Sequence, residues 1–171
     1  MLMAMPAWGN AQMLAAKTNL LYDALLIPSL GMEMAVGERA SLSLMGTFNP
    51  FSMGEHKWKN WSAQPEYRHW FHQVFTGPFI GFNACIGGFN IDKVRIGDLY
   101  DHQRQGMMFG AGVSAGYHLI LSTRFSCELV AGADFLHCSY DRYDGNVKEG
   151  RYHSGIIAPL GTGINLIYIL K

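Results

Sequence analysis

Apolar and small or polar residues alternate along most of this chain with a period of two, and no long window shows helical periodicity. The segment "MFGAGVSAGYHL" (108–119) is typical: Phe, Ala, Val, Tyr and Leu alternate with Met, Gly, Ser and His. Successive side chains of a strand point to opposite faces, so this pattern predicts strands with one apolar face. Eight strands are predicted, over residues 16–26, 29–37, 40–49, 61–71, 78–89, 104–119, 124–140 and 155–170.

The strand count and the connections together predict the architecture. Several strands reach the roughly nine to eleven residues that a tilted crossing of a bilayer needs. Long polar connections ("PFSMGEHKWKN", "NIDKVRIGDLYDHQ", "DRYDGNVKEGRYHS") alternate with short ones ("GER", "HQVFTG", "ILST"). This asymmetry is typical of bacterial barrels with short periplasmic turns. We therefore expect an all-β fold, an eight-stranded antiparallel up-and-down transmembrane β-barrel. A soluble lipocalin-like barrel is the alternative.

Composition narrows the class of protein. The 171 residues suffice for one domain, and 13 Lys and Arg against 13 Asp and Glu give no basic field for nucleic acid. No apolar run is long enough for a transmembrane helix. Three cysteines, without CxxC or Cys/His metal spacing, predict neither a disulfide-stapled scaffold nor a metal site. No cofactor is expected.

The first twelve residues, "MLMAMPAWGNAQ", resemble the tail of a secretory signal peptide. They are largely apolar, and the small residues Gly9 and Ala11 suit a signal-peptidase site. We expect residues 1–12 to be a signal remnant and residues 13–171 to form a single barrel domain. The predicted localisation is the outer membrane, reached by export through the periplasm.

The stretch "NWSAQPEYRHWF" (60–71) separates with period two into an apolar face and a polar face that carries Glu66 and Arg68. Charges fit inside a narrow barrel only when they are paired and hydrogen-bonded. We therefore predict an internal ion-pair network that plugs the lumen; a proton relay or a pore constriction is the alternative. Its expected members are Glu33, Glu66, Arg68, Arg104, Glu128 and Asp134. Such a plug argues against a solute channel, and Pro65 predicts a bulge or a break in strand pairing.

Aromatic residues gather near the predicted strand ends, where girdles would meet the two membrane interfaces. The girdle candidates are Trp58, Trp61, Tyr67, Trp70, Phe71, Phe75, Tyr140, Tyr143 and Tyr168.

Seven short motifs together resemble one family: "KTNLLYD" (17–23), "NPF" (49–51), "WKNW" (58–61), "QPEYRHW" (64–70), "GAGVSAGY" (110–117), "YDRY" (140–143) and "LIYILK" (166–171). The chain is similar from about Lys17 onward to the domain-of-unknown-function 3575 family, small outer-membrane barrels of Bacteroides-type bacteria. The resemblance implies an outer-membrane barrel whose gene often lies beside fimbrial or other surface-assembly genes. It implies no catalytic residue.

Two functions remain open at this point. The first is a non-enzymatic barrel that serves as an anchor or accessory subunit of a cell-surface, for example fimbrial, assembly. An outer loop carrying His56, Lys57, Trp58 and Lys59 would then contact lipopolysaccharide phosphates or a partner protein.

The second is a lipid A-modifying hydrolase, in which His137 and Ser139 share a strand face and Glu149 orients the base.

Overall fold

The computed structural model describes residues 13–49, 52–53, 56–92, 103–144 and 147–170, so the predicted signal remnant lies outside it. Ten strands and a short helix follow in chain order: β1 Leu14–Asn19, α1 Leu20–Ala24, β2 Ser29–Ala35, β3 Ala40–Asn49, β4 Ser52–Met53, β5 His56–Trp70, β6 Gly77–Asp92, β7 Gln103–Ile120, β8 Phe125–Asp144, β9 Val147–Ala158 and β10 Gly163–Ile169. Within these ranges no helix has the length and apolarity that crossing a membrane requires.

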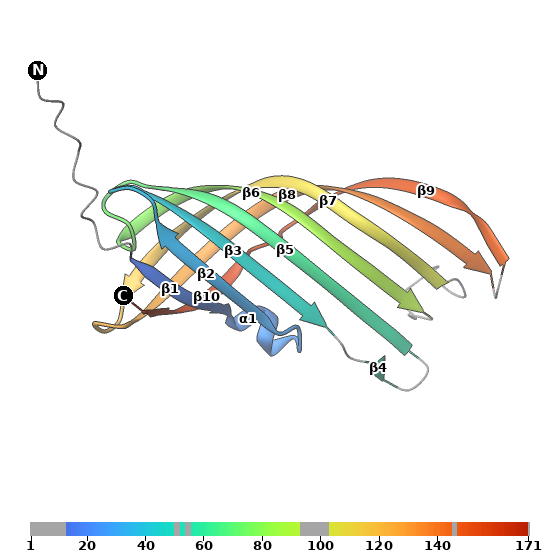
Figure 1. Cartoon of the computed structure of the whole chain (residues 1–171), viewed down its shortest axis with the longest axis horizontal. Helices are drawn as coiled ribbons and strands as arrows, with labels where there is room; N and C mark the ends of the chain where they lie inside the picture. Colours follow the sequence, from blue (N-terminus) through green and yellow to red (C-terminus); the bar gives the residue numbers. More distant parts are fainter. Residues whose placement is uncertain (1–12, 50–51, 54–55, 93–102, 145–146, 171) are drawn as a thin grey trace, which may run out of the picture.

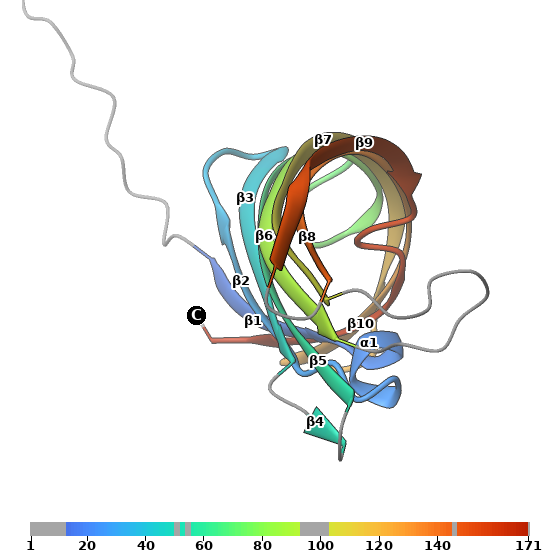
Figure 2. The same ribbon diagram turned by 90° about the vertical axis from the view of Figure 1, so that its right-hand side faces the viewer.

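The strands form one antiparallel sheet that closes on itself. Neighbours in the sheet follow the order β1, β2, β3, β5, β6, β7 and β8, and β10 pairs with both β8 and β1. β9 and β10 are successive partners of β8 and together form the eighth wall strand. The predicted all-β, eight-stranded antiparallel barrel is therefore confirmed, and Figure 2 shows its ring of strands.

The predicted last strand (155–170) is interrupted in the structure. β9 ends at Ala158 and β10 begins at Gly163, with a turn between them that contains Pro159 and Gly161. Gly161 has a φ of 70°, a left-handed conformation that favours glycine. Proline cannot donate to a strand ladder, so this pair of residues ends the pairing.

The predicted first strand (16–26) is wrong in its second half, where the chain forms α1. Asn19 causes the change, because its side-chain Oδ1 accepts hydrogen bonds from the backbone N–H groups of Leu21 (3.0 Å) and Tyr22 (3.3 Å). This is the N-cap interaction that starts a helix. α1 lies against β10 and also contacts β1.

Strands β5 to β9 continue well beyond the closed ring toward the end that carries the long connections (Figure 1). Much of the sequence predicted as outer loops therefore belongs to strands. In particular, β5 begins at His56 and β9 at Val147. The predicted loop surface His56–Lys59 is thus part of β5, which is a correction.

Pro65 breaks the pairing of β5 with β6 without a bulge. Ala63 pairs with Ile86 and Glu66 pairs with Asn83 in the same register, and the two residue pairs between them are missing. On the other side, Pro65 still faces Leu44 of β3. The predicted break is confirmed, and the missing N–H of proline explains it.

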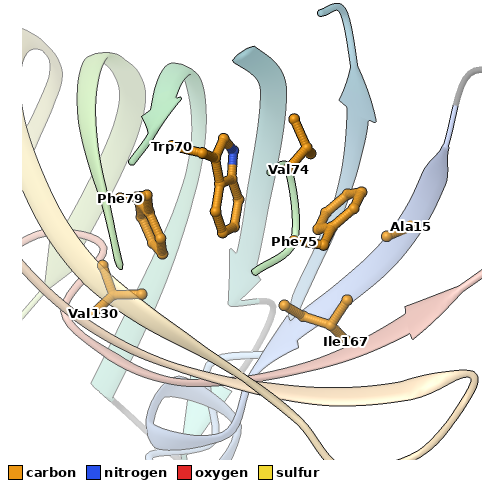
Figure 3. Packing of buried hydrophobic residues seen from close by; sticks show 7 residues of the cluster. All are labelled: Ala15, Trp70, Val74, Phe75, Phe79, Val130 and Ile167. Carbon is orange, nitrogen blue, oxygen red and sulfur yellow. The ribbon is translucent and has the colours of Figure 1, made fainter. Parts of the chain in front are cut away.

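One end of the barrel is filled by an apolar cluster (Figure 3). Its members are Ala15, Trp70, Val74, Phe75, Phe79, Val130 and Ile167. The turn between β5 and β6 folds into this end, where the Val74 N–H donates to the Glu38 carbonyl at 3.1 Å. Trp70 and Phe75 are therefore core residues, and their expected place in an aromatic girdle is wrong.

Candidate functional site

The centre of the barrel holds Arg68, which contacts three carboxylates. Its Nη1 lies 2.9 Å from Glu33 Oε2 and 3.0 Å from Glu128 Oε2, and its Nε lies 2.7 Å from Glu66 Oε2. The guanidinium carbon also lies 4.4 Å from the centre of the Phe79 ring. One fully charged side chain thus joins β2, β5 and β8 across the lumen.

Glu33 connects this centre to β1 and to the apolar cluster. Lys17 Nζ lies 2.9 Å from Glu33 Oε2, and the Ser41 hydroxyl donates to Glu33 Oε1 at 2.6 Å. The indole N–H of Trp70 in turn donates to the Ser41 oxygen at 2.8 Å. Every polar atom in this chain of contacts is buried and has a partner, the condition for a stable buried network.

The other two carboxylates have further polar partners. Ser114 donates its hydroxyl to Glu66 Oε1. His118 Nδ1 lies 3.1 Å from Glu128 Oε1, and the Asn165 amide donates to Glu128 Oε2 at 3.3 Å. The side chains of the network come from seven strands, so their contacts hold these strands of the barrel wall together.

The structure brings four of the six predicted network residues together: Glu33, Glu66, Arg68 and Glu128. Asp134 is buried, with 1% exposure, but forms no ion pair in the described part of the chain. Its carboxylate has no hydrogen bond of good geometry, although the Asn83 side chain and the Leu160 backbone lie beside it. The Arg104 side chain lies outside the described residues. Sequence reasoning missed Lys17 and His118.

Glycines on the inner face of β6 and β7 make room for these groups. A β-carbon at Gly81 would collide with Glu66 and Ser114, and one at Gly112 would collide with Asp134. Small residues on one face, which the sequence shows along β7, thus allow large inward side chains from neighbouring strands to meet.

The space left beside the network is a cavity of about 30 Å³. Three buried polar atoms without a protein partner belong to residues that line it: Gln64 Nε2, Asn83 Oδ1 and Asn165 Oδ1. This volume holds one or two water molecules, which such atoms can bind. At this level the lumen is filled by side chains.

The outward faces have the opposite character. Leu30 (71% exposed), Phe82 (58%) and Phe109 (57%) stand for a larger set of exposed apolar side chains on β2 to β10. On each strand they alternate with buried residues, for example Leu42 and Leu44 with Ser41 and Ser43. The face of residues 61–71 that carries Glu66 and Arg68 is the interior face, as predicted.

His137 and Ser139 lie two residues apart on the outward face of β8. The His137 ring stacks on His153 of β9, with ring centres 5.5 Å apart, and lies 5.1 Å from the Phe109 ring. No hydrogen bond joins His137 to Ser139 in the described structure, and the Glu149 side chain lies outside it. The structure thus does not assemble the base and nucleophile of the hydrolase hypothesis.

The remaining predicted contact residues, His56, Lys57, Trp58 and Lys59, lie at the start of β5, and their side chains are outside the described part of the structure. Among the described residues, no group of three or more His, Cys, Asp or Glu side chains is placed to hold a metal ion.

Comparison with known proteins places the chain in a family. No significant match was found among the curated proteins or among the solved structures. A family model described as "Protein of unknown function (DUF3575)" matches residues 1–170, which is nearly the whole chain. The chain therefore belongs to this DUF3575 family, the family that its motifs resemble.

Proposed function

We propose that this protein is a non-enzymatic outer-membrane β-barrel with a plugged polar interior, which serves as an anchor or accessory subunit of a cell-surface assembly such as a fimbria. One observation carries the membrane part of the proposal. Charged side chains such as Glu33, Arg68 and Glu128 are buried inside, whereas large apolar side chains such as Leu30, Phe82 and Phe109 point outward.

This distribution is the reverse of a water-soluble protein and suits hydrocarbon as the solvent. A contiguous exposed apolar patch of more than a few hundred square ångströms is rare on a soluble monomer. A closed barrel also satisfies its backbone within the wall, as a membrane-spanning sheet must. The alternating apolar faces of β2, β3, β6 and β7 together support insertion into a bilayer.

The two ends of the barrel suggest its orientation. The short connections at residues 36–39, 71–76 and 121–124 share one end with the start of β1 and the finish of β10, where the Leu170 N–H donates to the Leu14 carbonyl at 2.8 Å. Short turns face the periplasm in bacterial outer-membrane barrels. The extended parts of β5 to β9 would then project from the cell and present the surface for a partner.

An anchor role suits the filled lumen better than transport does. The network around Arg68 and the apolar cluster around Phe75 both obstruct the axis, and eight strands leave little space for water. The contacts to lipid, lipopolysaccharide or a partner protein would all be made by outward or projecting surfaces.

Insertion is tested by mixing the refolded protein with phosphatidylethanolamine and phosphatidylglycerol vesicles and floating them on a density gradient. We expect the protein to float and to migrate faster on a gel before heating than after it. A protein that remains in the aqueous fraction without detergent would contradict the membrane proposal.

The accessory role is tested by purifying the tagged protein from detergent-solubilised outer membranes and analysing lipid A from the same cells. We expect a stoichiometric surface protein and an unchanged acyl pattern. A changed pattern that is lost in a His137→Ala variant would instead support the hydrolase.

A further inference from the structure

An apolar groove of about 690 Å³ lies in the wall where β5 loses its pairing with β6. Its lining includes Pro65 and Ala84, whose side chains are small, and several larger apolar residues. The larger apolar residues that line it are Leu14, Met32, Met34, Leu42, Leu44, Tyr67 and Phe82. The groove is open on its outer side and is not an enclosed cavity.

The groove follows from local sequence. Proline cannot bond to the neighbouring strand, and Ala84, which would face it in the unbroken register, carries only a methyl group. Leu44 pairs with Pro65 from the β3 side and Tyr67 comes two residues later on the same face of β5. Small residues between large ones on a shared face leave a depression.

We infer that this groove holds one acyl chain of a membrane lipid, an inference that rests on the proposed insertion of the barrel. The large side chains that line the groove are apolar. Of the polar residues that also line it, Glu33 and Glu66 are held in the internal network, and Ser43 and Asn83 lie on the inward faces of their strands. Met32 and Met34 add flexible, polarisable side chains, which adapt to a chain of variable shape.

The position of the groove explains why its occupant comes from the bilayer. Exposed apolar side chains continue on both sides of it along the strands, with Phe48 and Trp61 toward the long-connection end and Phe71 toward the short turns. A water-soluble ligand would have to pass through this apolar belt to reach Pro65. An acyl chain is already present in the bilayer. A chain that lies in the groove makes van der Waals contacts with its walls that loosely packed lipid would leave unmade.

The test compares Ala84→Phe, which fills the groove, with Ala111→Phe as the matched control. Ala111 pairs directly with Ala84 in the β6–β7 ladder and is exposed on the same outward face, but it does not line the groove. Each protein is reconstituted in phosphatidylethanolamine and phosphatidylglycerol vesicles, extracted in mild detergent and examined by native mass spectrometry for retained phospholipid.

We expect the wild type and Ala111→Phe to retain one phospholipid more than Ala84→Phe. Equal retention by all three would overturn the inference, and so would a dimer that only Ala84→Phe abolishes, because a second copy would then cover the groove. Ala84→Leu and Ala111→Leu repeat the comparison with less bulk if the phenylalanine variants do not fold. Vesicle flotation of the same samples separates this inference from the proposed membrane insertion. If the proteins float but all retain the same amount of phospholipid, the acyl-chain inference is refuted and the insertion proposal stands.

Discussion

Replacing Arg68 with leucine is expected to destabilise the barrel by about 3–5 kcal/mol, the usual cost of removing one member of a buried ion pair. The side chain is 3% exposed and is the shared partner of three carboxylates. Leucine replaces much of its volume but none of its charge. The loss therefore arises from electrostatics more than from packing.

The three carboxylates are not affected equally. Glu33 keeps its ion pair with Lys17 at 2.9 Å. Among the described residues, Glu66 keeps the Ser114 hydroxyl, and Glu128 keeps His118 Nδ1 at 3.1 Å and the Asn165 amide at 3.3 Å. The Glu66 side chain is 11% exposed and the Glu128 side chain is fully buried, so we expect the larger share of the penalty to come from Glu128. Adding Glu128→Gln to Arg68→Leu should cost less than the sum of the two single changes, because the charge left unpaired is then removed.

The free energy of unfolding is measured by urea titration of the refolded protein in detergent, with tryptophan fluorescence and the heat-dependent gel shift as probes. Arg124→Leu is the matched control, since Arg124 is exposed and, among the described residues, its side chain donates to the Tyr168 hydroxyl alone, at 3.2 Å. Its effect should stay below about 0.5 kcal/mol. An Arg68→Leu barrel within about 1 kcal/mol of the wild type would refute the idea that this network holds the wall together.

Three further changes test other parts of the interior by the same titration. Gly116→Ala should destabilise by about 1–3 kcal/mol, because the new β-carbon would come within 2.7 Å of a β8 carbonyl oxygen, whereas Gly46→Ala, with its nearest atom at 3.6 Å, should be tolerated. Asp134→Asn should raise the free energy of unfolding by about 1 kcal/mol or more, since it removes a buried carboxylate that has no cation beside it. A loss of stability would mean that another group stabilises the carboxylate. Phe75→Ala should cost about 3–5 kcal/mol, and Phe71→Ala, half exposed on the outer face, much less; equal effects would contradict the plug.

The wall of the barrel was predictable because its pattern is local. β3 occupies the predicted residues 40–49, and Glu66 and Arg68 face inward as the alternation requires. Side chains in a strand point alternately to its two faces. Once one buried residue is known, the direction of every other side chain in that strand is therefore known as well. α1 escaped this reasoning because a single N-cap, Asn19, overrides a run of strand-compatible residues.

The membership of the network was less predictable because it depends on contacts across the lumen. By strand register, Arg68 lies level with Gly81, Ser114 and Gly132. Along β8, Asp134 is two residues from Gly132 and Glu128 is four residues from it, yet Arg68 contacts the more distant Glu128. Parity places both acids inside, but strand tilt and closure decide which of them comes within reach.

The interior also limits where a function can reside. An apolar cluster fills the short-turn end, the network around Arg68 fills the middle, and the cavity beside it has room for about one or two waters. A ligand larger than water would have to break ion pairs in a low-dielectric interior to pass. Substitutions inside should therefore change stability and leave binding intact. Changes in lipid or partner binding should arise from outward residues such as Ala84 and from the projecting strands β5 to β9, and loss of partner binding in a stably folded Arg68 variant would contradict this division.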